Sequence, residues 1–288
     1  EILVFHSRKR SGNMHPFRWQ SRRSGLGARL LGLCSLLVAA YSWGTDARTW
    51  VPLVARRASE WGRAATEEEL KKTVPTLYVY DHCPFCVRAR MIFGLKRMPF
   101  KLDFLMNDDV VTPTKMTGKK VLPILDMEGE AMGESLDIVA KIDAVGKPIL
   151  AKAADRKDID QWLKDNKDLM RKLTRPRDAH ALYPEFATRA ARATWVKNHQ
   201  LSGSSFEEAL DSSEEYLKQI NDELPKLAEM IHGDTVNDGG VSYDDITLWP
   251  TLRRLTIVKG IKWPERLRNY LLYMEDVCDV PILEGMAI

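Results

Sequence analysis

The chain is poor in cysteine, and this narrows the classes of protein to which it can belong. It has four cysteines in 288 residues, Cys34, Cys83, Cys86 and Cys278. So few cysteines do not make the disulfide framework of a small secreted domain. A second Cys-x-x-Cys and a His-x₃-His are both missing from the sequence, so the four ligands of a structural zinc site are not in place. The cysteine content therefore indicates that the chain after its N-terminal region, called the body below, suits a reducing compartment. No bound metal is expected.

A long hydrophobic run is missing as well. The apolar stretch from Leu30 to Ala40 has about eleven residues, short of the roughly 20 that a comfortable membrane span needs. The remainder of the chain carries no internal repeat, phosphate-binding loop or low-complexity tract. At 288 residues, the chain can hold two domains and an extension.

The charge is unevenly distributed. Residues 1–74 carry 13 Lys+Arg against 6 Asp+Glu, whereas the remainder carries 30 against 34. The basic balance therefore belongs to the N-terminal region, and the body holds no basic patch interleaved with aromatic residues. No nucleic-acid partner is expected.

Residues 1–74 have the composition of a targeting leader. Seven Lys+Arg and one acidic residue precede the apolar segment Leu30–Ala40, which is a signal-peptide pattern. The stretch Arg48–Arg63 is again rich in arginine and poor in acids, and is typical of a transit peptide. We expect a largely disordered bipartite leader that directs the body to a plastid through the secretory route, with a simple mitochondrial or plastid presequence as the rival interpretation. Two further alternatives are a membrane anchor formed by Leu30–Ala40 and untranslated sequence before Met14.

The motif Cys83-Pro84-Phe85-Cys86 is the strongest chemical signal in the chain. The β-branched and aromatic residues of Thr76–Tyr80 predict a strand before it, and Pro84 is suited to the first turn of a following helix. Cys83 would then face the free N–H groups and the positive end of the helix dipole, which favour a thiolate. Cys86 follows one helical turn later and can close a disulfide with Cys83. The motif predicts a redox site; half a zinc site and a structural disulfide are the alternatives, and so tight a loop would stabilise little.

The sequence around this motif resembles the glutaredoxins. Tyr80–Cys86 and the following Ala89–Lys96 are similar to the large, glutathione-transferase-like glutaredoxin 2 family. The similarity continues through Asp245–Thr256, Gly260–Pro264 and the terminal Met286-Ala287-Ile288, and it covers roughly residues 75–288. It implies a fold of α/β + all-α class, in which a thioredoxin-like N-terminal domain is followed by an all-helical, glutathione-transferase-like C-terminal domain.

The domain boundaries follow from the change in pattern along the chain. We place the thioredoxin-like domain at 75–147, a linker at 148–154 and the helical domain at 155–288. Further strands are predicted at Phe100–Leu105 and Val121–Leu125, and a helix is predicted to open at Glu134-Ser135 with apolar positions at Leu136, Val139 and Ile142. In the second domain, apolar residues between Ile159 and Leu173 fall at helical spacing. Ser242 and Asp245 form an acidic variant of a capping box.

The resemblance also implies a glutathione site. Pro123 would be the cis proline beside the active cysteines, and Leu122 would offer its backbone to the glutathione peptide. Ser135 would bind the γ-glutamyl carboxylate and Glu134 the ammonium; the alternative for Ser135 is a simple helix N-cap. Lys120 could pair with the glycine carboxylate or be a solvated surface lysine. Small glutaredoxins place a lysine shortly before the first cysteine, and its absence here leaves open what stabilises the Cys83 thiolate.

The predicted function is a glutathione-dependent thiol–disulfide oxidoreductase. Cys83 would be the nucleophile and Cys86 the resolving thiol, with glutathione as co-substrate and glutathionylated or disulfide-containing proteins as partners of a monomer. One alternative is a dehydroascorbate reductase or thiol-type glutathione transferase. Another, of a different class, is a membrane-inserting protein of the intracellular chloride-channel type. A glutathione-ligated iron–sulfur carrier is disfavoured because Pro84 stiffens the turn.

Overall fold

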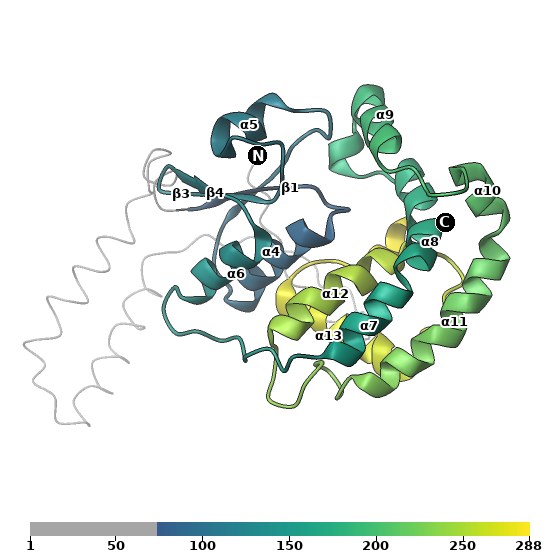
Figure 1. The fold of residues 1–288 in the computed structure, drawn as a ribbon. Coiled ribbons are helices and arrows are strands. Elements are labelled where there is room, and N and C mark those ends of the chain that lie inside the picture. The colour runs from purple at the N-terminus through teal and green to yellow at the C-terminus, as the bar shows by residue number, and fades with distance from the viewer. Residues whose placement is uncertain (1–73) are drawn as a thin grey trace, which may run out of the picture. The chain divides into compact units, whose positions relative to one another are not determined.

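The computed structural model describes residues 74–288 (Figure 1). The predictions for the leader, including Leu30–Ala40 and Arg48–Arg63, lie outside this range. The first part of the described chain is built from β1 (Thr76–Val79), α4 (Pro84–Leu95), β2 (Lys101–Phe104), α5 (Val111–Thr117), β3 (Ile124–Met127), β4 (Glu130–Met132) and α6 (Ser135–Asp143).

The four strands form one mixed sheet in the order β2-β1-β3-β4. β1 runs parallel to β2 and antiparallel to β3, and Leu77 is paired with Leu102 on one side and with Leu125 on the other. β3 and β4 form an antiparallel hairpin. Helices α4 and α6 pack against each other, and Figure 1 shows α5 on the opposite side of the strands. This arrangement is thioredoxin-like, and it places the β1–α4 turn at one end of a central strand.

The third strand begins three residues later than the sequence predicts, at Ile124 instead of Val121. Val121, Leu122 and Pro123 precede β3, whose first residue is Ile124. The Leu122–Pro123 peptide bond is cis, as predicted. Pro123 has no N–H to give to a sheet, and the pairing therefore starts only after it.

The second part of the chain is helical, with a single isolated β-bridge between Ala151 in the connecting segment and Ser242. Its elements are α7 (Lys157–Asp165), α8 (Lys167–His180), η1 (Pro184–Phe186), α9 (Arg189–Asn198), α10 (Phe206–Asp211), α11 (Ser213–Met230), α12 (Tyr243–Leu255), α13 (Glu265–Cys278) and η2 (Glu284–Met286). The single periodic stretch between Ile159 and Leu173 is divided between α7 and α8 at Asn166. The predicted capping box is present at the start of α12, where the Ser242 N–H donates to Asp245 Oδ2 at 2.8 Å.

Helix α4 connects the two parts because it packs against α12 and α13 as well as α6. Its buried residues include Cys86, Met91, Ile92 and Phe93. At Gly94 the helix lies so close to α13 that a Cβ atom would be 1.7 Å from the Cys278 carbonyl oxygen. The helix that carries the cysteines is therefore held by both parts of the described chain.

Candidate functional site

The two cysteines of the motif lie on the first turn of α4 and differ sharply in exposure. Cys83 is the N-cap residue and is partly exposed, whereas Cys86 is fully buried. Both are free thiols. The Cys86 Sγ accepts a hydrogen bond from the Tyr80 N–H at 3.3 Å, which fixes its position behind the end of β1. The Cys83 thiol is therefore accessible to a substrate, whereas the Cys86 thiol is not.

The surroundings of the two sulfurs shift the pKa values of the two thiols in opposite directions. The hydrogen bond from the Cys86 thiol is the largest influence that lowers the pKa of Cys83, to about 6. His82 and then the backbone N–H groups of Cys86 and Phe85 act in the same direction, and burial opposes them. Burial, the hydrogen bond to Cys83 and the negative charge of the Cys83 thiolate raise the pKa of Cys86 well above its usual value. The second thiol and the helix N–H groups thus stabilise the thiolate without a lysine before Cys83.

We expect the alkylation rate of Cys83 by iodoacetamide to rise through about pH 6 and to level off above about pH 7, because only the thiolate reacts. The lowered pKa keeps the thiolate populated at acidic pH, and replacing Cys86 with alanine should shift the midpoint to higher pH by removing the thiol donor. Cys278 should not interfere, since burial raises its pKa. A midpoint near the ordinary value of about 8.5 would contradict the geometry.

The segment before β3 presents free backbone groups. Within residues 74–288, neither the N–H nor the C=O of Leu122 has a hydrogen-bond partner. A Cβ atom on Gly133 would be 3.9 Å from the Pro123 carbonyl oxygen, so the segment that leads into α6 runs beside this proline. The segment of Leu122 and Pro123 and the segment that leads through Glu134 to Ser135 therefore run side by side, with Leu122, Pro123 and Ser135 buried.

The interpretation of Ser135 as an N-cap was wrong. Glu134 is the N-cap of α6, with a φ of 64°, and its C=O accepts the first helical hydrogen bond from Ile138 at 3.0 Å. Ser135 is the first helical residue and is nearly buried, and its hydroxyl has no partner in the described chain. The left-handed backbone of Glu134 moves the start of the helix by one residue, which leaves the Ser135 hydroxyl at the positive end of the helix.

The two neighbouring lysines have different partners. Lys119 forms an exposed ion pair with Glu134, with Nζ and Oε1 2.9 Å apart. Lys120 instead donates to the Asn107 carbonyl oxygen at 2.6 Å and joins the loop after β2. Lys120 is thus a partly buried structural contact rather than the freely solvated lysine of the alternative interpretation.

Asp81 links the motif to the helical domain, and sequence reasoning missed it. Arg253 of α12 donates to the Asp81 carbonyl oxygen and to its Oδ1, each at 2.9 Å. Arg90 of α4 donates to the same carboxylate. Burial alone would raise the pKa of Asp81, but the charges of Arg253 and Arg90 outweigh it and lower the pKa. The partners are 172 residues apart in sequence, so no local pattern could have indicated the contact.

Replacing Arg253 with methionine should therefore reduce the free energy of unfolding by about 3 kcal/mol, because a nearly buried carboxylate loses one of its two cations. Urea unfolding measures this change. Arg268→Met removes the more exposed ion pair with Glu284 and should cost about 1 kcal/mol or less. Equal effects of the two substitutions would show that Arg253 does not secure the motif.

His82, the residue before Cys83, lies in a second cluster that was not predicted. Its Nδ1 is 2.6 Å from Glu185 Oε1, and its backbone N–H donates to the same oxygen at 3.0 Å. On the other side of the ring, the indole N–H of Trp195 donates to Nε2 at 2.8 Å. All three residues are buried. Glu185 belongs to η1 and Trp195 to α9, so the helical domain holds the turn at this second point.

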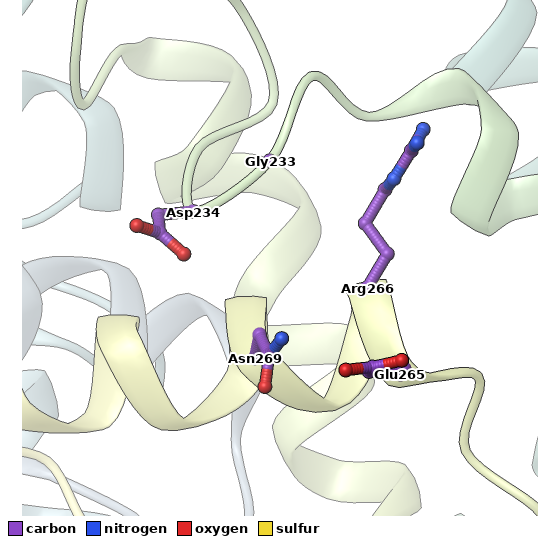
Figure 2. Close-up of a pocket in the computed structure, with 5 residues that line it drawn as sticks. All are labelled: Gly233, Asp234, Glu265, Arg266 and Asn269. Atoms are coloured by element: carbon purple, nitrogen blue, oxygen red, sulfur yellow. The ribbon is translucent and has the colours of Figure 1, made fainter.

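A hollow elsewhere on the helical domain is distinct from this site. It has a volume of about 390 Å³ and is lined by Gly233, Asp234, Glu265, Arg266 and Asn269 (Figure 2). It contains no cysteine, and the Arg266 guanidinium donates to the carbonyl oxygens of Ala228 and Ile231. Residues 74–288 contain no group of three or more His, Cys, Asp or Glu placed to hold a metal ion. None of the helices in this range is long and apolar enough to cross a membrane.

In comparisons with known proteins, each of the two parts of the chain matches a family model. Residues 77–145 match the family model of the glutathione S-transferase N-terminal domain, and residues 158–287 match that of the glutaredoxin 2 C-terminal domain. Glutaredoxin 2 of Escherichia coli K12 is 42% identical over 214 residues, which are 74% of this chain and 99% of that protein.

Solved structures agree with this assignment. The structure of glutaredoxin 2 from Salmonella typhimurium in complex with glutathione is 41% identical, has a TM-score of 0.72, and covers 75% of this chain and 100% of its own. FzlA from C. crescentus, at 17% identity and a TM-score of 0.52, shares the fold and covers 75% of this chain and 96% of its own. The chain therefore belongs to the glutaredoxin 2 family of glutathione-dependent oxidoreductases.

Proposed function

We propose that this protein reduces protein–glutathione mixed disulfides and protein disulfides through Cys83 and Cys86, with glutathione as co-substrate. The observation that carries the proposal is the division of labour between the two thiols: Cys83 is partly exposed and has a pKa of about 6, and Cys86 is buried with a raised pKa. A nucleophile must be ionised and accessible, whereas a resolving thiol must wait until a mixed disulfide has formed.

The reaction follows from this division. The Cys83 thiolate attacks the glutathione sulfur of a protein–glutathione disulfide; a bond forms between Cys83 and glutathione, and the target thiolate leaves with the electron pair. A second glutathione thiolate then attacks the bound glutathione sulfur and releases Cys83 and glutathione disulfide. With a protein disulfide, Cys83 forms a mixed disulfide with the target, and Cys86 attacks Cys83 to release the reduced target.

The region around Pro123 supports the proposed glutathione site. Leu122 has a free N–H and C=O that can pair with the glutathione backbone, and the Ser135 hydroxyl and N–H at the start of α6 are suited to a carboxylate. Glu134 is suited to the γ-glutamyl ammonium, for which it must leave its exposed ion pair with Lys119. Lys120 is the weaker candidate, since a backbone carbonyl already holds its ammonium group. The structure of the Salmonella typhimurium relative, solved in complex with glutathione, supports glutathione as the ligand.

Residues 1–74 are proposed as a leader that delivers the oxidoreductase to a plastid or a mitochondrion and is removed there. The support is compositional: basic residues before Leu30–Ala40 and the arginine-rich stretch after it. A fusion of this segment to a fluorescent protein tests the proposal, and diffuse fluorescence of the uncleaved fusion would contradict it.

The function is tested by the turnover of a glutathionylated peptide in an assay coupled to glutathione and glutathione reductase. Measurable turnover by the folded protein supports the proposal. A folded protein that fails in this assay but reduces dehydroascorbate with glutathione would favour the dehydroascorbate reductase alternative instead.

A further inference from the structure

Helix α8 carries an arginine whose hydrogen-bond donors are only partly used. Arg175 is partly buried, and its Nη1 donates to the Gln200 carbonyl oxygen at 2.8 Å. Its Nε is buried and has no hydrogen-bond partner within residues 74–288. A guanidinium has five N–H groups and a full positive charge, and one neutral carbonyl does not satisfy either. Arg175 therefore retains both the charge and the donors that bind an anion.

The carboxylates near Arg175 on the same helix are already engaged. Asp168 pairs with Arg171, with Oδ1 and Nη1 3.2 Å apart. Asp178 pairs with Arg254 of α12, whose Nε donates to Oδ2 at 2.9 Å. Burial and the positive charges of Arg171 and Arg254 lower the pKa of Arg175. The surroundings of Arg175 are thus positive and favour an anionic ligand.

Two sets of contacts place Arg175 beside the cysteine turn, and the first runs through α9. Gln200, whose carbonyl oxygen holds Arg175, lies just beyond the end of this helix. The same helix carries Trp195, and its indole N–H donates to His82, the residue before Cys83. The end of α9 therefore joins the arginine to one side of the turn.

The second set of contacts runs through α12. Arg254 binds Asp178, which follows Arg175 by about one helical turn on α8. The neighbouring Arg253 donates to the carbonyl oxygen and to the carboxylate of Asp81, two residues before the nucleophile. Both sets of contacts thus lead from Arg175 to the residues that precede the reactive thiol.

The arginine lies in the basic part of the helical domain. Residues 167–200 carry 8 Lys+Arg against 3 Asp+Glu, whereas residues 201–245 carry 2 against 12. The large aromatic side chains of the basic stretch, those of Tyr183, Phe186 and Trp195, are buried and cannot stack on nucleic-acid bases. The charge of this stretch therefore matches an acidic polypeptide.

We propose that Arg175, with Arg171 one turn before it, binds an acidic side chain of the target polypeptide while Cys83 attacks the disulfide that this polypeptide carries. The inference rests on the proposed function and names its substrate class, disulfides flanked by aspartate or glutamate. The groups proposed for glutathione lie on the thioredoxin-like domain, whereas Arg175 lies on the helical domain, so the carboxylate that it binds comes from the target. Arginine presents paired N–H groups to a carboxylate, and complementary charge speeds the encounter of the two proteins.

The experiment compares two glutathionylated peptides as substrates of the full chain. The peptides have the same length and one cysteine, and they carry either glutamate or glutamine on both sides of it. The value of kcat/KM for the peptide reports the attack by Cys83 and not the later release of glutathione. We expect the wild type to prefer the glutamate peptide by about 10-fold at low ionic strength, and the preference to shrink as salt is added.

Three variants assign the preference to Arg175. Arg175→Gln should lower kcat/KM for the glutamate peptide about 10-fold, to the value for the glutamine peptide. Arg175→Lys keeps the positive charge and should retain part of the preference. Lys218→Gln removes one charge from an exposed position on α11, and this matched control should keep the wild-type preference. The basic residues 1–74 are the same in all variants, so a difference between variants does not come from them.

Two results would overturn the proposal while leaving the oxidoreductase function intact. One is an unchanged preference in Arg175→Gln, and the other is an equal loss of kcat/KM with both peptides, which would show that Arg175 does not read the target. If Arg175→Gln does not fold, Arg171→Gln replaces it, and an unchanged preference in that variant would likewise overturn the proposal. A folded wild type that turns over neither peptide would contradict the proposed function itself, and this inference with it.

Discussion

Replacing Cys83 with serine should lower glutathione-coupled turnover of a glutathionylated peptide by at least about 10³-fold, to the background rate. The serine hydroxyl is not ionised near neutral pH, so the helix N–H groups and the Cys86 thiol no longer have a thiolate to stabilise. The loss should therefore appear with every disulfide substrate and should not be rescued by raising the glutathione concentration. Residual turnover well above background would show that another group is the nucleophile.

Cys86→Ser is the matched control for this loss. The variant retains the accessible Cys83 and should keep most of the monothiol turnover, because glutathione itself resolves that intermediate. It should lose reduction of protein disulfides and accumulate a mixed disulfide with the target, which mass spectrometry detects. Equal losses in both assays for the two variants would contradict the division of roles between the thiols.

The parts of the site that follow from local chemistry could be predicted from the sequence. Pro84 marked the start of α4, and the third strand and its cis proline at Pro123 were anticipated, although the pairing begins one residue after that proline. The capping box at Ser242 was also predictable, because its members are three residues apart. These features depend on the covalent limits of proline and on hydrogen bonds within one helical turn.

The errors arise where the backbone departs from an ideal pattern. Leu136 was expected to be one of the apolar residues with which α6 packs into the core of the domain. Its side chain is 42% exposed, and Ile138 is fully buried instead. Ser135 is the first residue of this helix and not its N-cap, because Glu134, with its left-handed backbone, takes the cap position. The buried apolar side chains of α6 are Ile138, Val139 and Ile142, so two of the three predicted positions face the core.

The contacts that hold the motif in place could not be found in one sequence. His82 is 103 residues from Glu185 and 113 from Trp195, and Asp81 is 172 from Arg253. Each of these residues is unremarkable in its own segment, and only the packing of the helical domain on the β1–α4 turn brings them together. The β1–α4 turn, which carries the two cysteines, is thus held in place by groups from the helical domain.

Gly94→Ala should reduce the free energy of unfolding by about 3 kcal/mol or more, although helix propensity alone would favour alanine by about 1 kcal/mol. An alanine Cβ would be 1.7 Å from the oxygen and 2.2 Å from the carbon of the Cys278 carbonyl. These are backbone atoms at the end of α13, so no side-chain rotation can relieve the overlap and α4 must separate from α13. The steric cost therefore outweighs the gain in propensity.

Urea unfolding of Gly94→Ala and Gly233→Ala measures this balance. Gly233 has open space where a Cβ would be added, and its substitution should change the free energy of unfolding by no more than about 0.5 kcal/mol. Because α4 also carries Cys83 and Cys86, separation from α13 should loosen the cysteine turn, and the alkylation midpoint of Cys83 should move above about pH 6 in the folded variant. A variant as stable as the wild type would contradict the close approach of the two helices. A destabilised variant with an unchanged alkylation midpoint would show that the thiolate depends on the first turn of α4 alone and not on its support by the helical domain.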